Sequence, residues 1–137
     1  MTNLIFIDQN VPNSQLLIDA LPPDSQYFLL DDKQDGIQQI ADILQGWQNL
    51  DSIQIFSHGA SGTLTLGSSV INNQNLKNYQ QQLEQIGKSL SSNGDLLLYG
   101  CDVAQGNNGQ VFINSLAQLT GADVAASNDL TGCGARG

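Results

Sequence analysis

Short apolar runs alternate with helical stripes along this chain, and that alternation most constrains its fold. Apolar runs of strand length stand at 4–7, 27–30, 53–56, 96–99 and 124–126. Because these runs are continuously apolar rather than alternating, they indicate strands buried on both faces. Apolar residues at helical spacing separate the runs, around 16–21, 37–47, 73–91 and 109–119. The sequence therefore predicts an α/β three-layer sandwich with a mostly parallel sheet in the order 2-1-3-4-5 and helices on both faces.

Two segments refine this outline. The segment 63–71 carries two very short extended pieces around a Gly-Ser-Ser turn, which predicts a small hairpin beside a loop that carries His58. The segment 73–91 has the clearest helical stripe, and Asn93-Gly94 is expected to end that helix.

Length and charge limit the classes of function. The 137 residues show no internal repeat or linker, so we expect one domain over 1–132 and a glycine-rich tail over 133–137. The formal net charge of −9 argues against nucleic acid as a partner. No apolar run approaches the ~18 residues needed to cross a bilayer, so membrane insertion is not expected. The amino terminus lacks the basic segment of a cleaved signal peptide, which leaves the localisation open.

Metal and cofactor sites find little support in the sequence. One histidine and two cysteines, at 58, 101 and 133, lack paired ligand spacing, so we expect neither a metal nor a cofactor. Asp8, Asp31 and Asp32 follow the first two strands, but the aspartate pattern of a phosphate-accepting receiver domain is incomplete. We expect most of these carboxylates to be loop residues and helix caps.

The strongest candidate site is a pairing of His58 with Cys101. IQIF runs into Ser57-His58-Gly59, and LLLY runs into Gly100-Cys101. If those two strands are neighbours, their ends lie about 5 Å apart and bring a base and a nucleophile to one sheet edge. A nearby histidine can take the proton of a thiol, and the backbone N–H groups of Gly59 and Cys101 are candidates for an oxyanion hole. The simpler readings are a solvated loop histidine and a cysteine that is buried or bonded to Cys133.

These two motifs resemble the caspase–haemoglobinase fold of cysteine peptidases, in which a His-Gly and a Gly-Cys close successive strands. The resemblance implies a catalytic dyad of His58 and Cys101. More narrowly, SHGASGTLTLG, DLLLYGCDVAQG and SLAQLTGADVAASNDLTG resemble a bacterial domain of unknown function near the amino terminus of large secreted, adhesin-like repeat proteins. That resemblance implies export by a route without a signal peptide.

The resemblance leaves two classes of function open. The first is a cysteine peptidase that cleaves its parent chain or another polypeptide, with Asp102 and Asp129 in the substrate pocket. The second is a non-catalytic head module that serves interaction, folding or secretion. The caspase pattern Q-A-C-x-G is absent, and the basic residues are only Lys33, Lys77, Lys88 and Arg136. Specificity for aspartate is therefore not expected.

Overall fold

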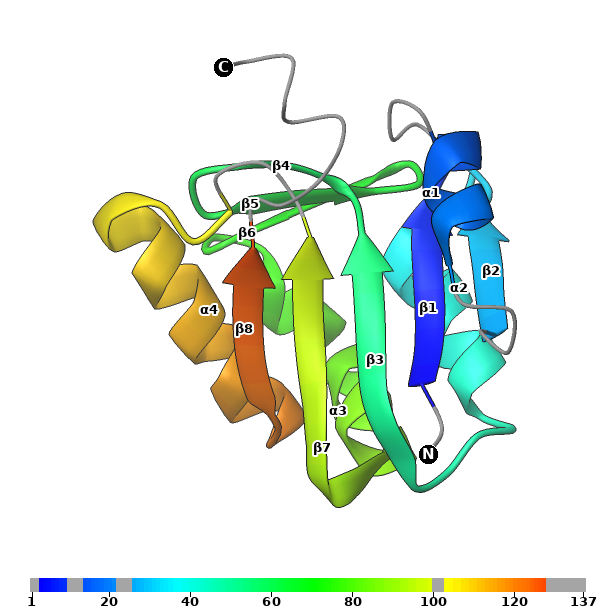
Figure 1. The fold of residues 1–137 in the computed structure, drawn as a ribbon. Coiled ribbons are helices and arrows are strands. Elements are labelled where there is room, and N and C mark those ends of the chain that lie inside the picture. Colours follow the sequence, from blue (N-terminus) through cyan, green and yellow to red (C-terminus); the bar gives the residue numbers. More distant parts are fainter. Residues whose placement is uncertain (1–2, 10–13, 22–25, 100–102, 128–137) are drawn as a thin grey trace.

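The chain folds around a five-stranded parallel sheet (Figure 1). A computed structural model describes residues 3–9, 14–21, 26–99 and 103–127. The strands of the main sheet, in spatial order, are β2 (Gln26–Leu30), β1 (Asn3–Asp8), β3 (Leu50–Phe56), β7 (Leu90–Tyr99) and β8 (Asp123–Ser127). This is the predicted order when the strands of the main sheet alone are counted. The predicted α/β class with a mostly parallel sheet is confirmed.

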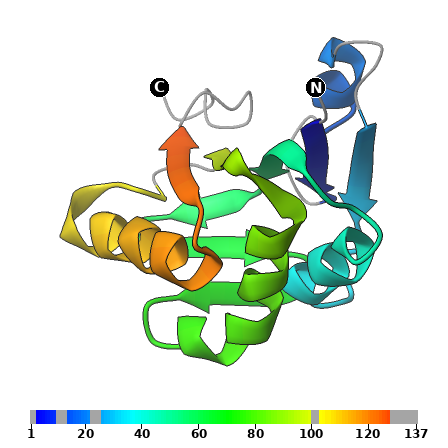
Figure 2. The same cartoon turned by 90° about the horizontal axis from the view of Figure 1, so that it is seen from below.

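Helices cover both faces of the sheet, as expected (Figure 2). One face carries α1 (Ser14–Ala20), and the other carries α2 (Gly36–Leu44), α3 (Gln80–Ser89) and α4 (Gly106–Thr120). A short 3-10 helix, η1 (Leu76–Tyr79), leads into α3. Of the helices that the structure describes, none is long and apolar enough to cross a membrane.

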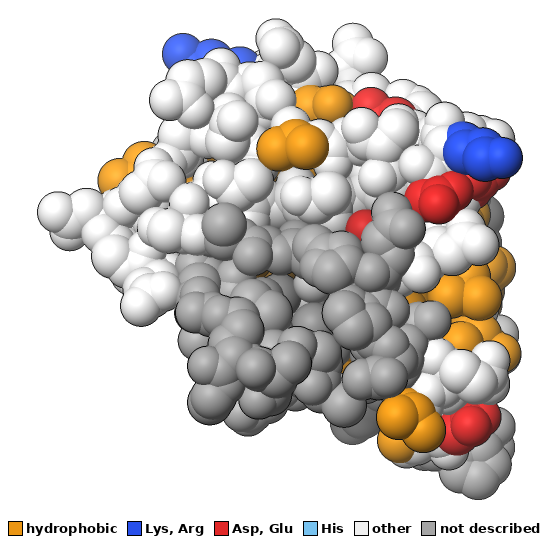
Figure 3. Space-filling view, turned by 90° about the horizontal axis from the view of Figure 1, so that it is seen from above, with side chains coloured by type: hydrophobic (Ala, Val, Ile, Leu, Met, Phe, Trp, Pro, Cys, Tyr) orange, Lys and Arg blue, Asp and Glu red, His pale blue; other side chains and the backbone are white. Residues whose placement is uncertain are grey.

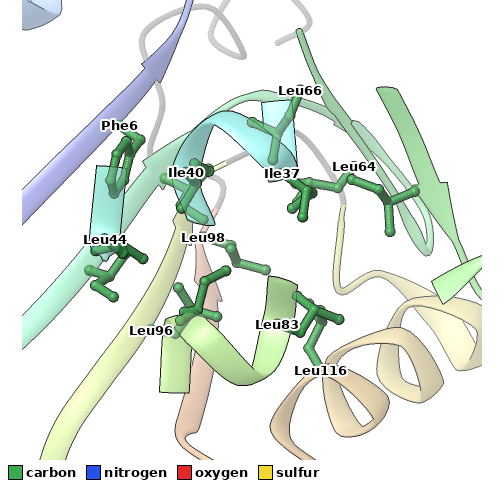
Figure 4. Packing of buried hydrophobic residues seen from close by; sticks show 14 of the residues in the cluster. Phe6, Ile37, Ile40, Leu44, Leu64, Leu66, Leu83, Leu96, Leu98 and Leu116 are labelled. Atoms are coloured by element: carbon green, nitrogen blue, oxygen red, sulfur yellow. The ribbon is translucent and has the colours of Figure 1, made fainter. Parts of the chain in front are cut away.

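The core has two parts because residues of each strand alternate between the two faces of the sheet. In β1, Leu4 and Phe6 join the large cluster under α2, α3 and α4, whereas Ile5 and Ile7 join a smaller cluster against α1. Figure 4 shows Phe6 facing α2, and Leu96 and Leu98 of β7 facing α3. Both faces of the central strands are thus buried, which explains their continuously apolar sequences.

The predicted end of the third long helix is wrong. Helix α3 ends at Ser89, and Asn93-Gly94 lies inside β7 rather than at a helix terminus. Gly94 is buried where a Cβ would come within 2.7 Å of the Leu50 carbonyl oxygen, and the register between β3 and β7 shifts beside this point. Gly94 was expected to end a helix, but in the structure it permits the close approach of β3 and β7.

The predicted hairpin is confirmed, but the loop expected around His58 is a strand. The hairpin consists of β5 (Thr63–Leu66) and β6 (Ser69–Asn72), and Gly67 between them has a φ of 60°. The chain leaving β3 then forms β4 (His58–Ala60), in which His58 pairs with Thr65. Residues 58–60 form a strand because they pair in antiparallel fashion with the free edge of the hairpin. This pairing could not be predicted from the sequence of 57–62 alone.

Candidate functional site

The strands that carry the two motifs are neighbours and end together. Phe56 of β3 is in register with Tyr99 of β7, and their rings stack with centroids 4.6 Å apart. One residue further on, the Ser57 backbone N–H donates to the Tyr99 carbonyl oxygen at 3.0 Å. The adjacency expected from the sequence is therefore present at the carboxyl edge of the sheet, where parallel sheets place their sites.

The structure describes only some of the expected site residues. The backbone of His58 and Gly59 is described and lies in β4, directly after this edge. The other named residues, Cys101, Asp102, Asp129 and Cys133, lie outside the described residues. The separation of His58 and Cys101 and the disulfide between Cys101 and Cys133 therefore remain predictions.

Hydrogen bonds tie the chain on either side of residues 100–102 to the segment that contains His58. Before this interval, the Tyr99 carbonyl oxygen accepts from the Ser57 N–H. After it, the Val103 carbonyl oxygen accepts from the Gly62 backbone N–H at 2.9 Å. Thus 57–62 contacts both flanks of the short interval that contains Cys101.

The start of α4 reinforces this connection through polar side chains. The Ser61 hydroxyl donates to the Gln105 carbonyl oxygen at 2.6 Å, and the Asn108 amide donates to the Ser61 carbonyl oxygen at 2.8 Å. Gly62 has a φ of 66°, and a Cβ there would come within 2.4 Å of the Asn108 amide nitrogen. This network was not predicted, because the Ser61 and Asn108 contact joins residues far apart in the sequence.

The antiparallel sheet is also joined to the start of α2. The Gly36 backbone N–H donates to the Ser69 hydroxyl at 3.2 Å, and the Asp35 carboxylate caps the helix by accepting from the Ile37 and Gln38 N–H groups. Burial raises the pKa of Tyr79, and the nearby Asp35 adds to this rise, while a hydrogen bond with Ser69 opposes it. These contacts hold β5 and β6 beside the carboxyl edge.

Asp8 is neither a loop residue nor a helix cap, which are the roles expected for most of the three carboxylates. It is the last residue of β1 and is 0% exposed, in contrast to Asp31, which is partly exposed and lies in the loop after β2. Ser57 is also 0% exposed, and its hydroxyl oxygen has no hydrogen-bond partner among the described residues. In the sequence, Asp8 directly follows the apolar run 4–7, and this position could have indicated a polar group at the carboxyl edge of the sheet.

The rest of the described surface carries fewer groups that could bind or react with a ligand. A hollow of about 450 Å³ is lined by polar residues of η1 and α3, and another of about 180 Å³ lies among glutamines of α2 and α3. The described residues contain no group of three His, Cys, Asp or Glu side chains that could hold a metal ion. Viewed from above, the face at the carboxyl edge carries separate acidic and apolar groups around its border (Figure 3). The strand ends remain the best candidate site.

The fold and this edge define an α/β domain whose candidate site follows two adjacent parallel strands. Residues 4–137 match the family described as "Domain of unknown function (DUF4347)", and the chain belongs to that family. No curated protein matches the sequence. The chain is similar to a solved structure described as "Crystal structure of a small-chain dehydrogenase", with 8% identity, a TM-score of 0.46, and coverage of 92% of this chain and 81% of the other. So distant a likeness assigns no activity.

Proposed function

We propose that this domain is a caspase-like cysteine peptidase in which His58 and Cys101 form the catalytic dyad. The observation that carries the proposal is the pair of backbone hydrogen bonds from 57–62 to Tyr99 and Val103. Since these bonds lie on both sides of Cys101 in the sequence, they favour a position for the thiol near His58. The substrate would be a polypeptide, with the parent chain as one candidate.

The dyad supports acyl transfer by a sequence of steps that conserves atoms and protons. His58 takes the thiol proton, and the Cys101 sulfur attacks the peptide carbonyl carbon to form a C–S bond. Backbone N–H groups of Gly59 and Cys101 would stabilise the oxyanion. The imidazolium then protonates the departing amine as the C–N bond breaks. Water, which gives a proton to His58, attacks the thioester carbon, the C–S bond breaks, and the proton returns from His58 to the Cys101 sulfur. No metal or cofactor takes part in this scheme.

Substrate specificity can be predicted from the acidic residues that flank the site. Asp102 follows the proposed nucleophile, and Asp129 follows β8, so carboxylates would line the pocket for the residue before the scissile bond. We expect reduced protein, profiled with a peptide library, to prefer a basic or small residue at that position. A preference for acidic residues would contradict the proposed pocket. Arg136-Gly137 is one such bond within the chain itself.

A non-catalytic interaction module is the second candidate function. Strand β2 lies at an edge of the main sheet and carries two exposed apolar side chains, Tyr27 at 43% and Leu29 at 50%. An exposed edge of this kind can pair with a strand of another protein. This function is favoured if the reduced protein cleaves no peptide and Cys101 is inert to electrophiles.

A further inference from the structure

Asp8 and Ser57 are two buried polar residues on neighbouring strands at the centre of the carboxyl edge. Ile7 of β1 is in register with Phe56 of β3, so the next residues along these parallel strands, Asp8 and Ser57, are neighbours. Adjacent strands lie about 4.8 Å apart. Both residues are 0% exposed, whereas most aspartates and serines lie at protein surfaces.

Both side chains fall on the same face of the sheet. In β1 the large core cluster takes Leu4 and Phe6, and the two-residue period assigns Asp8 to that face. In β3 the cluster takes Ile53 and Ile55, and the same period assigns Ser57 to it. The carboxylate therefore lies at the end of an apolar core, beside the strand end from which the chain continues directly into His58.

We infer that Asp8 is a positioning residue for His58, whose buried carboxylate orients the imidazole and favours its protonated form. This inference rests on the proposed function, because it supplies the dyad with a third group. A carboxylate in apolar surroundings interacts strongly with a nearby cation, since little water screens the two charges. During acyl transfer the Asp8 carboxylate would stabilise the imidazolium that forms when His58 takes the thiol proton.

Other charged groups approach the same edge from the loop between β2 and α2. That loop carries Asp31, Asp32, Lys33 and Asp35. Asp31 accepts from the Lys33 backbone N–H, and Asp35 caps α2, so both carboxylates have local structural roles. Tyr79 is hydrogen-bonded to Ser69 and Asp35, and burial raises its pKa. Asp8 differs from these groups in being fully buried directly beside Ser57.

The single histidine makes the inference directly measurable. An NMR titration of the ¹⁵N-labelled imidazole reports His58 alone, since the chain contains one histidine. We expect Asp8→Asn to lower the midpoint of this titration by about one pH unit, a tenfold weaker affinity for the proton. Two controls should leave it nearly unchanged: Asp32→Asn, in the loop at the same edge, and Asp95→Asn, in β7 near the opposite edge.

A measurement on the unsubstituted protein covers the case in which Asp8→Asn does not fold. The midpoint of His58 in the folded protein should lie above its midpoint in concentrated urea, where the carboxylate is no longer held nearby. An equal or lower midpoint in the folded state would overturn the inference, as would a shift in Asp8→Asn no larger than in the controls.

Peptide cleavage, measured with the same samples, separates this inference from the proposed function. If the His58 midpoint depends on Asp8 but the unsubstituted protein cleaves nothing, the pairing stands and the peptidase proposal fails. If cleavage depends on Cys101 but the midpoint of the His58 titration is the same in Asp8→Asn as in the unsubstituted protein, the peptidase proposal stands and the positioning role fails.

Discussion

Cys101→Ala and His58→Ala should each abolish peptide-bond cleavage by the reduced protein. The first substitution removes the proposed nucleophile, and the second removes the base that takes its proton, so we expect a loss of roughly 10⁴-fold or more in turnover. Cleavage of the best library peptide, followed by mass spectrometry, measures the loss. Circular dichroism should show that both variants keep the fold.

Cys133→Ala is the matched control for these substitutions, because it removes the only other thiol. Its cleavage rate should equal that of the unsubstituted protein. Cleavage that survives in Cys101→Ala would show that another group is the nucleophile, and the peptidase assignment would then be wrong. A loss of cleavage in Cys133→Ala would show that Cys133 also contributes to cleavage, which the dyad of His58 and Cys101 does not predict.

Phe6→Ala should strongly destabilise the folded protein. Phe6 is 0% exposed in a central strand, faces α2 and stacks on Phe28 with ring centroids 5.8 Å apart. Replacing a buried phenylalanine by alanine costs about 3–5 kcal/mol of unfolding free energy, much of the stability of an ordinary domain. Urea unfolding followed by circular dichroism measures this loss.

Tyr27→Ala provides the comparison for Phe6. Tyr27 is an aromatic residue of the adjacent strand β2, but its side chain is 43% exposed. We therefore expect a loss of less than about 1 kcal/mol. Equal losses in the two variants would contradict the packing of Phe6 between the sheet and α2.

The parallel sheet could be predicted because its strands are buried on both faces. Runs such as 4–7 and 53–56 contain no polar alternation, and helical stripes separate them, which leaves few alternatives to crossover connections. Non-local pairing was harder to predict. Gly94 lies in a strand because β7 extends along β3, and His58 lies in β4 because a hairpin later in the chain offers an edge.

The adjacency of the two motifs could also be predicted, since the expected order 2-1-3-4-5 places the third and fourth strands of the main sheet side by side. Phe56 and Tyr99 are in register, as that order requires. The roles of Asp8 and Ser57 could not be predicted, because burial of a polar side chain depends on its neighbours in space. The bond from Gly62 to Val103 likewise joins residues far apart in the sequence and emerges only in the fold.

The pH dependence of thiol alkylation tests the dyad most directly. Reduced protein is treated briefly with iodoacetamide across a pH series, and each cysteine is quantified by mass spectrometry. Since no Lys or Arg lies between Lys88 and Arg136, trypsin leaves both thiols on one peptide, and digestion at aspartates separates them. We predict that Cys101 reacts with a midpoint below the ordinary thiol pKa of about 8.5, that Cys133 reacts near that value, and that His58→Ala moves Cys101 toward Cys133. Identical profiles for both cysteines, unchanged by His58→Ala, would contradict the account.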